Sequence, residues 1–155
     1  MELRIRLADP SSAATLTAIA KEAKASWGYP PEWLAAWESS LTFDADYLGR
    51  HTVFVAMVDG TAAGVCALED HGTHWMLEHV WVLPSFQRHG VGKALVRHAV
   101  RKAAAIRPGV VRVQSDPNAT DFYLELGAEP VGAVPAPMPG DPKRRLPLFE
   151  LTAGA

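Results

Sequence analysis

Two glycines among basic side chains stand where an apolar run ends and a helical pattern begins, and they form the segment best suited to bind a ligand. Gly90 and Gly92 follow a run that closes at Pro84, and Lys93 lies in the expected first helical turn. Glycine lets a ligand approach the backbone closely, and the first N–H groups of a helix lack helical partners and suit a phosphate. Because cations such as Arg88 and Lys93 oppose the dipole at that end, the segment predicts an anion site.

The common nucleotide motifs do not account for this segment. G-x-x-x-x-G-K-[ST] is absent because Ala94 follows Lys93, and G-x-G-x-x-G fails because Leu95 stands three residues after Gly92. The alternative is a tight strand-to-helix turn that binds nothing.

The remaining sequence predicts the elements that would position this segment. Apolar alternation or continuous apolar runs indicate strands at residues 3–7, 51–58, 61–68, 75–83, 110–114, 129–134 and 148–151. The helices expected from periodicity, caps and breakers span residues 13–25 with Ser11 or Ser12 as N-cap, a short stretch from Pro31, residues 91–106 and residues 120–126.

Two segments carry less information. Residues 44–50 show no clear pattern, and residues 135–147 hold five prolines and the basic cluster Lys143, Arg144 and Arg145, which predicts a solvated loop.

The run at 75–83 is apolar at both odd and even positions, as in a strand buried on both faces in the middle of a sheet. Together the elements predict an α/β (α+β) fold: one domain over residues 1–155, with a mixed central sheet of six to seven strands and about four flanking helices.

Two motifs in this order resemble those of the GNAT superfamily of N-acetyltransferases. Residues 82–92, VLPSFQRHGVG, are similar to its coenzyme A signature, a strand ending in V-x-P and then Q/R-x-x-G-x-G/A. Residues 116–119, DPNA, and 122–128, FYLELGA, are similar to its later N-A and F-Y-x-x-x-G-A pattern. The resemblance implies the GNAT-like acyl-CoA N-acyltransferase fold and acetyl-CoA as co-substrate.

The resemblance also implies which residues hold the cofactor. The strand before the glycines would splay from its neighbour and hold the pantetheine arm with the backbone of Val80, Trp81 and Val82, the N–H of Val82 polarising the thioester carbonyl. Asn118 would contact the cofactor, or else cap a helix. The pyrophosphate would rest on the loop residues Gln87, Arg88, His89, Gly90, Val91, Gly92 and Lys93.

Two catalytic residues are implied in the same way. Tyr123, five residues after Asn118, would protonate the departing thiolate, since a phenol and a thiol have pKa values near 10 and 8.5; otherwise it is a core tyrosine. Glu78, flanked by apolar residues that would raise its pKa, would take the amine proton through water. The alternatives are a glutamate paired with an arginine, and His79 as the base.

Aromatic residues crowd the segment where this fold frames its acceptor. Trp27, Tyr29 and Trp33 could wall a pocket or clasp an amine by cation–π contact; ordinary helix packing is the alternative. We therefore expect direct transfer of acetyl from acetyl-CoA to a primary amine of a small molecule. The alternatives are a protein N-terminal or lysine acetyltransferase and a non-catalytic acyl-CoA-binding module.

The composition limits the kinds of partner and metal to be expected. The formal charge is −2 over 155 residues, so no bulk positive field gathers nucleic acid or a membrane surface. Cys66 is the only cysteine, and His71, His74 and His79 lack accompanying ligands, so no metal is expected. The start MELRIRLADP lacks the apolar core of a signal peptide. A cytoplasmic location and, by analogy, a homodimer are the expectations.

Overall fold

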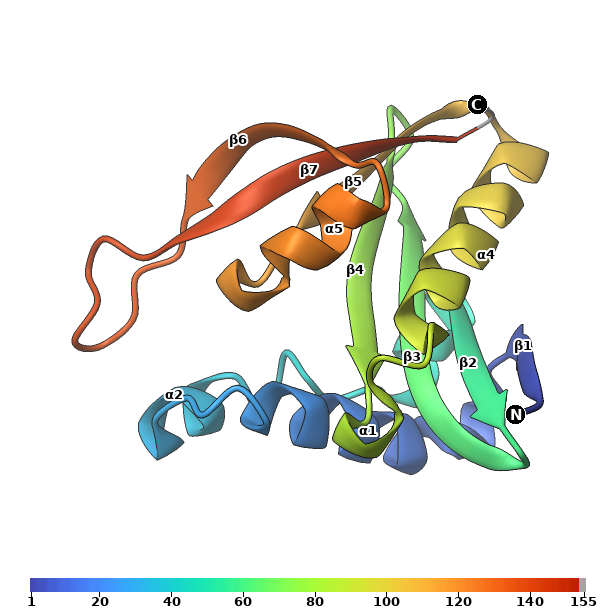
Figure 1. Cartoon of the computed structure of the whole chain (residues 1–155), viewed down its shortest axis with the longest axis horizontal. Helices are drawn as coiled ribbons and strands as arrows, with labels where there is room; N and C mark the ends of the chain where they lie inside the picture. The colour runs from blue at the N-terminus through green and yellow to red at the C-terminus, as the bar shows by residue number, and fades with distance from the viewer. Residues whose placement is uncertain (154–155) are drawn as a thin grey trace.

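All seven predicted strands form, and they join in one mixed sheet. The computed structural model describes residues 1–153, and its strands follow the order β1-β2-β3-β4-β5-β7-β6 (Figure 1). Every neighbouring pair is antiparallel except β4 and β5, which run parallel. The strands are β1 Leu3–Leu7, β2 Thr52–Val58, β3 Thr61–Asp70, β4 Trp75–Val82, β5 Gly109–Gln114, β6 Glu129–Pro135 and β7 Arg145–Ala153.

Within residues 1–153, five α-helices flank this sheet. They are α1 Ala13–Ala25, α2 Pro31–Ala36, α3 Ala45–Arg50, α4 Val91–Ile106 and α5 Thr120–Glu125. The helix α3 lies where the sequence shows no clear pattern, and Asp44 caps it by accepting the Tyr47 N–H at 2.8 Å. Between residues 1 and 153, no helix is both long and apolar enough to cross a bilayer.

The sheet separates two apolar cores. On one face Leu95 and Ala99 of α4 pack in a cluster with Cys66, and on the other Leu16 of α1 packs in a cluster with Val65. Val65 and Cys66 are consecutive residues of β3, so their side chains point to opposite faces. The middle strands therefore carry apolar side chains on both faces, as the sequence predicts for a sheet covered on both sides.

The sheet opens between β4 and β5. These strands pair only at Trp75 with Val111 and at Met76 with Arg112. Beyond Met76, β4 stays paired with β3 on one side only, while β5, β7 and β6 turn away together (Figure 1). This divergence is the gap that the resemblance implies.

A β-bulge lies at the point where the strands part. Ala67 and Leu68 of β3 face His79 and Leu77 of β4, so Glu78 has no partner across the ladder. An extra residue of this kind bends its strand and increases its twist. The bulge thus accounts for the direction that the second half of β4 takes.

Two local predictions hold in part. Ser12 is the N-cap residue of α1, as predicted, but its side chain makes no capping bond. Asp9 caps the preceding 3-10 turn, and its carboxylate accepts the Ser11 N–H at 3.0 Å. Residues 136–144 form the predicted loop, which closes the β6–β7 hairpin, but Pro135 belongs to β6, residues 145–147 belong to β7, and Arg144 is buried rather than solvated. Pro135 is tolerated because β6 is an edge strand, where a missing N–H breaks no central ladder.

Candidate active site

A cavity of about 530 Å³ lies where the glycine segment meets the open edge of β4. We call it the loop cavity. Six residues of the predicted phosphate segment line it: Gln87, Arg88, Gly90, Val91, Gly92 and Lys93. Other elements contribute Trp27, Val80, Val82, Asn118 and Tyr123. His89, from the same predicted set, does not line it.

The amides of this segment are available to a ligand. Within residues 1–153, no hydrogen bond to another protein group engages the backbone N–H groups of residues 88–93, and the first helical bond of α4 runs from Ala94 to Gly90. Gly90 adopts φ +78° and Arg88 adopts φ +64°, left-handed conformations that turn successive amides inward. An α4 N-terminus flanked by Arg88 and Lys93 therefore suits a diphosphate.

Gly92 is required by close packing. A Cβ atom there would stand 3.1 Å from Cε1 of Phe122 and 3.5 Å from Cγ2 of Val82. The small residue lets the start of α4 approach both α5 and β4, and this approach shapes the cavity.

The backbone of β4 presents alternate residues to the gap. Leu83 donates its N–H to Ala63 of β3 at 2.9 Å, so the hydrogen-bonding groups of Leu83 face β3. In an antiparallel ladder this direction alternates, which turns the N–H and C=O of Val80 and Val82 toward the gap, where β5 no longer pairs. The backbone of Trp81 faces β3 instead, and its predicted role with the pantetheine arm stays a prediction.

A second cavity, of about 270 Å³, lies on the other face of β4. We call it the hairpin pocket because residues of the β6–β7 hairpin, including Met138 and Arg144, form one wall. Glu78, His79 and Trp81 of β4 form another. Since Val80 and Val82 line the loop cavity, the two cavities lie on opposite sides of one strand and are adjacent at the gap.

Comparison with known proteins identifies the family. The sequence profile of the Acetyltransferase (GNAT) family matches residues 16–128 of the 155. The chain belongs to this family. Family membership assigns acyl transfer from acetyl-CoA, and the arrangement of gap, amides and loop cavity fits that co-substrate. Among curated proteins, no sequence matches the chain.

Solved structures show the same GNAT fold. A GCN5-related N-acetyltransferase from Rhodopseudomonas palustris has a TM-score of 0.80 at 19% identity, covering 98% of this chain and 96% of that one. The PaiA N-acetyltransferase of Thermoplasma acidophilum, in complex with coenzyme A, has 0.75 at 17%, covering 98% and 99%. YncA of Salmonella typhimurium, with its cofactor acetyl-CoA, has 0.72 at 19%, covering 100% and 96%.

The predicted GNAT base, Glu78, lies in the bulge of β4 and lines the hairpin pocket. The residue is exposed at the mouth of the pocket, but partial desolvation by its surroundings raises the pKa of its carboxyl, and the negative charge of Glu69 raises it further. Among the described residues no ion pair or hydrogen bond engages the Glu78 side chain. The alternative of a glutamate paired with an arginine is therefore not what this structure shows.

His79 is unsuited to be the base. Its ring is buried, and its Nδ1 accepts the Nε1–H of Trp81 at 2.9 Å, so the remaining proton belongs on Nε2. Burial lowers the pKa of His79 to about 4. A neutral ring with its lone pair already engaged takes up a proton poorly at pH 7.

Tyr123 lies in the core and also lines the loop cavity. It stacks on Phe149 with ring centroids 5.7 Å apart, and burial raises the pKa of its phenol, which stays protonated. The structure shows Tyr123 as a core tyrosine, and its role as the acid stays a prediction.

Asn118 does not cap α5. Its Nδ2 donates to the Tyr29 hydroxyl at 2.9 Å and to Asp116 at 3.0 Å, while the α5 N-cap is Ala119. Its side chain lines the loop cavity, so contact with the cofactor stays a prediction.

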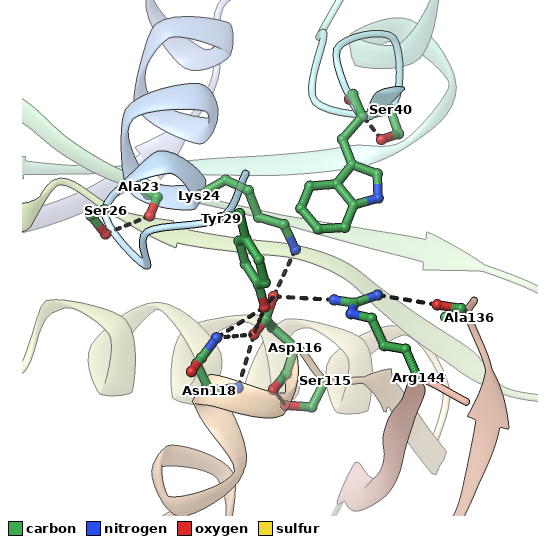
Figure 2. Close-up of polar contacts among 11 residues, drawn as sticks. Ala23, Lys24, Ser26, Tyr29, Ser40, Ser115, Asp116, Asn118, Ala136 and Arg144 are labelled. Carbon is green, nitrogen blue, oxygen red and sulfur yellow. Dashed lines mark hydrogen bonds and ion pairs between the residues drawn. The ribbon is translucent and has the colours of Figure 1, made fainter. Parts of the chain in front are cut away.

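An ionic cluster that the sequence does not predict lies beside the hairpin pocket (Figure 2). Lys24 Nζ is 2.7 Å from Asp116 Oδ2, and Tyr29 donates its hydroxyl proton to the same carboxylate at 2.8 Å. Arg144 Nη2 lies 3.9 Å from Asp116 Oδ2. The pKa of Asp116 is lowered: its burial acts in the raising direction, but the hydrogen bond from Lys24 and the other donors outweigh it.

The aromatic residues surround a cation of the chain itself. Lys24 Nζ lies 4.1 Å from the centre of the Trp37 ring, 5.1 Å from Tyr29 and 5.7 Å from Trp27. Trp33 donates its indole N–H to the carbonyl of Pro139 at 2.9 Å. In this structure the cation–π contacts foreseen for an acceptor amine are made with Lys24, and a direct acceptor role for Trp27, Tyr29 and Trp33 stays a prediction.

Cys66 is a core residue. It is fully buried, its Sγ lies 3.7 Å from the carbonyl oxygen of Leu95, and burial raises the pKa of its thiol. A thiol that stays protonated and reaches neither cavity is no nucleophile. Between residues 1 and 153, no group of three potential metal ligands comes together.

Proposed function

We propose that this protein transfers the acetyl group of acetyl-CoA directly to the primary amine of a small molecule. The observation that carries the proposal is the edge of β4 at Val80 and Val82, whose backbone N–H groups have no strand partner across the gap and stand between the loop cavity and the hairpin pocket. The carbonyl of Val82 accepts a hydrogen bond from the Gln87 side chain at 3.3 Å. A thioester held along that edge reaches from one cavity to the other. Donor and acceptor would thus approach from opposite faces of the sheet.

Each step has a residue in a suitable place. The amides of residues 88–93 bind the diphosphate, and the N–H of Val82 stabilises the negative charge that develops on the thioester oxygen, an effect of about 3–4 kcal/mol for a preorganised donor. Glu78 takes the proton of the attacking amine through water. As the new C–N bond forms and the C–S bond breaks, Tyr123 donates a proton to the sulfur.

The size of the hairpin pocket supports a small acceptor. Its volume is about 270 Å³, and it is lined by β4, the β6–β7 hairpin and residues after α2 such as Trp37 and Ser40. One structural neighbour, from Escherichia coli, is a ribosomal-protein alanine N-acetyltransferase with a TM-score of 0.73 at 17% identity, which shows the fold alone.

The test combines binding and turnover. We expect acetyl-CoA to raise the melting temperature and a panel of small primary amines to release free coenzyme A thiol. Tyr123→Phe should lower kcat about 100-fold, because the loss of a general acid costs about 10²–10⁴-fold, and should leave coenzyme A affinity within about twofold. Phe149→Leu, which alters the same stack without removing a proton donor, is the matched control.

Two results would contradict the proposal. Absence of thermal stabilisation at saturating acetyl-CoA would remove the donor site. Binding of acetyl-CoA without acetylation of any amine would indicate a non-catalytic acyl-CoA-binding module, the alternative that the sequence leaves open.

A further inference from the structure

The inner wall of the hairpin pocket carries more positive than negative charge. Lys24 and Arg144 face one carboxylate, Asp116, and their side chains are 10%, 7% and 6% exposed. The other titratable groups on the pocket are Glu78, across it on β4, and His79, which is neutral. Asp116 is bound by Lys24 at 2.7 Å, so the guanidinium shares this counter-ion, at 3.9 Å, with a closer cation.

The guanidinium of Arg144 also leaves most of its hydrogen-bond donors unused. The guanidinium makes a single hydrogen bond, from Nη1 to the carbonyl of Ala136 at 3.5 Å. Its Nη2 is the one buried side-chain nitrogen or oxygen within residues 1–153 that has no hydrogen-bond partner. A guanidinium carries five N–H donors in a planar fork. A buried and under-bonded cation is costly to the fold.

Packing holds this guanidinium in a fixed place. Its Cζ lies 5.1 Å from the centre of the Trp37 ring, 5.6 Å from Trp33 and 5.7 Å from Tyr29. Its neighbours Lys143 and Arg145 are exposed. The hairpin therefore turns one basic residue of three inward and presents it to the pocket in a rigid aromatic frame.

We propose that the acceptor amine also carries a carboxylate, which binds Arg144 beside Lys24 while the amino group faces Glu78 across the pocket. The planar fork matches a carboxylate in geometry, and a cationic wall opposite an anionic one matches an amino acid. The inference rests on the proposed function and narrows it to one acceptor class.

A binding experiment tests the anion site without turnover. The probes are butyrate and 3-phenylpropionate, each paired with its neutral amide, and the signal is tryptophan fluorescence of the coenzyme A complex, because Trp37 and Trp81 line the pocket. We expect the carboxylates to bind about 10-fold to 100-fold more tightly than the amides, as a charge-assisted hydrogen bond implies. Arg144→Met should abolish this difference, and Arg145→Met, which alters the exposed neighbour, should preserve it.

Thermal stability separates a ligand-binding arginine from a structural one. In Arg144→Met the Lys24–Asp116 pair remains neutral overall, so we expect a melting temperature equal to or above that of the wild type. Asp116→Asn leaves two cations together and should lower it. A fall in Arg144→Met as large as that in Asp116→Asn would show that the guanidinium serves the fold and would overturn the inference.

Turnover with matched acceptors completes the test. We expect kcat/KM at least 10-fold higher for phenylalanine and methionine than for phenethylamine and 3-(methylthio)propylamine, which lack only the carboxylate. Equal rates within each pair would overturn the carboxylate site and leave amine acetylation standing. Carboxylate binding that depends on Arg144, without acetylation of any amine, would support the site and reject the proposed transfer. Carboxylates that bind no better than amides, or do not bind, would overturn the site.

Discussion

The protonation state of Glu78 depends on the surroundings in which the β4 bulge places its carboxyl. The bulge turns its side chain into the hairpin pocket, and partial burial and the nearby Glu69 raise its pKa. A base acts only when ionised, so its pKa appears as an acidic limb in the rate profile.

We therefore expect kcat/KM to rise with pH through an apparent pKa above 4.5, the ordinary value for this carboxyl. Glu78→Gln should lower kcat about 100-fold near pH 7 and abolish that limb. The measurement is initial rates from pH 5 to 9 by thiol release. Glu125→Gln, which removes a carboxylate from the loop cavity, should keep the limb. If the acidic limb of the kcat/KM profile persists in Glu78→Gln, another group is the base that takes the amine proton.

His79 makes stability depend on pH in a defined direction. Its folded pKa of about 4 lies below the usual 6.5, so between these values the unfolded chain binds a proton and the folded chain does not. Stability therefore falls as pH drops from 6.5 to 4, by about 3 kcal/mol for this group.

His79→Gln tests this loss, because a glutamine can still accept the Trp81 indole N–H. We expect the free energy of unfolding in urea to fall less in the variant than in the wild type, by about 3 kcal/mol between pH 7 and pH 4. Parallel curves for the two proteins would mean that His79 is protonated equally in both states.

At the scale of elements, a glycine on β3 controls how closely β4 can approach β3. A Cβ atom at Gly64 would stand 2.9 Å from the carbonyl oxygen of Trp81, a backbone atom that cannot rotate away. Gly64 therefore fixes the position of the β4 edge from the neighbouring strand.

We expect Gly64→Ala to reduce the free energy of unfolding by about 1–3 kcal/mol, the usual cost of overpacking, and to weaken coenzyme A binding because Val80 and Val82 shift with Trp81. Urea denaturation and calorimetric titration measure the two effects. Gly109→Ala is the control, since its Cβ would meet nothing within 4 Å. Unchanged affinity in Gly64→Ala would show that the edge does not bind the cofactor.

The predicted elements differ from the observed ones mainly at the hairpin. Its prolines and basic residues indicate a solvated loop, yet β7 begins at Arg145 and Arg144 is buried. Local composition cannot show this, because the partners that cover Arg144 are more than a hundred residues earlier in the chain, at Tyr29, Trp33 and Trp37.

At the scale of the whole molecule, coenzyme A should link segments that are separate in the chain. The loop cavity joins residues of β4, the start of α4 and α5. Ligand that binds only the folded state stabilises it by about 2.7 kcal/mol at 100 times Kd.

We expect coenzyme A to slow hydrogen exchange at the backbone amides of residues 80–93, where Val80, Val82 and the α4 N-terminus lack protein partners, and to leave the β1–β2 edge unchanged. Mass spectrometry of the free and bound protein measures this. Protection spread evenly over the chain would point to global stabilisation without a site at the gap. The single domain, the homodimer and the cytoplasmic location stay predictions.

The sequence by itself determined the strands and the main helices, because periodicity and turn residues are local properties. It also determined the glycine segment proposed to bind the cofactor, because helix N-termini act through adjacent amides. Only the tertiary structure decided which face each β4 residue presents, since one bulged residue at Glu78 resets the alternation. It alone also decided the charged wall of the hairpin pocket, since Lys24, Asp116 and Arg144 come from distant parts of the chain and the charge of the wall depends on all three.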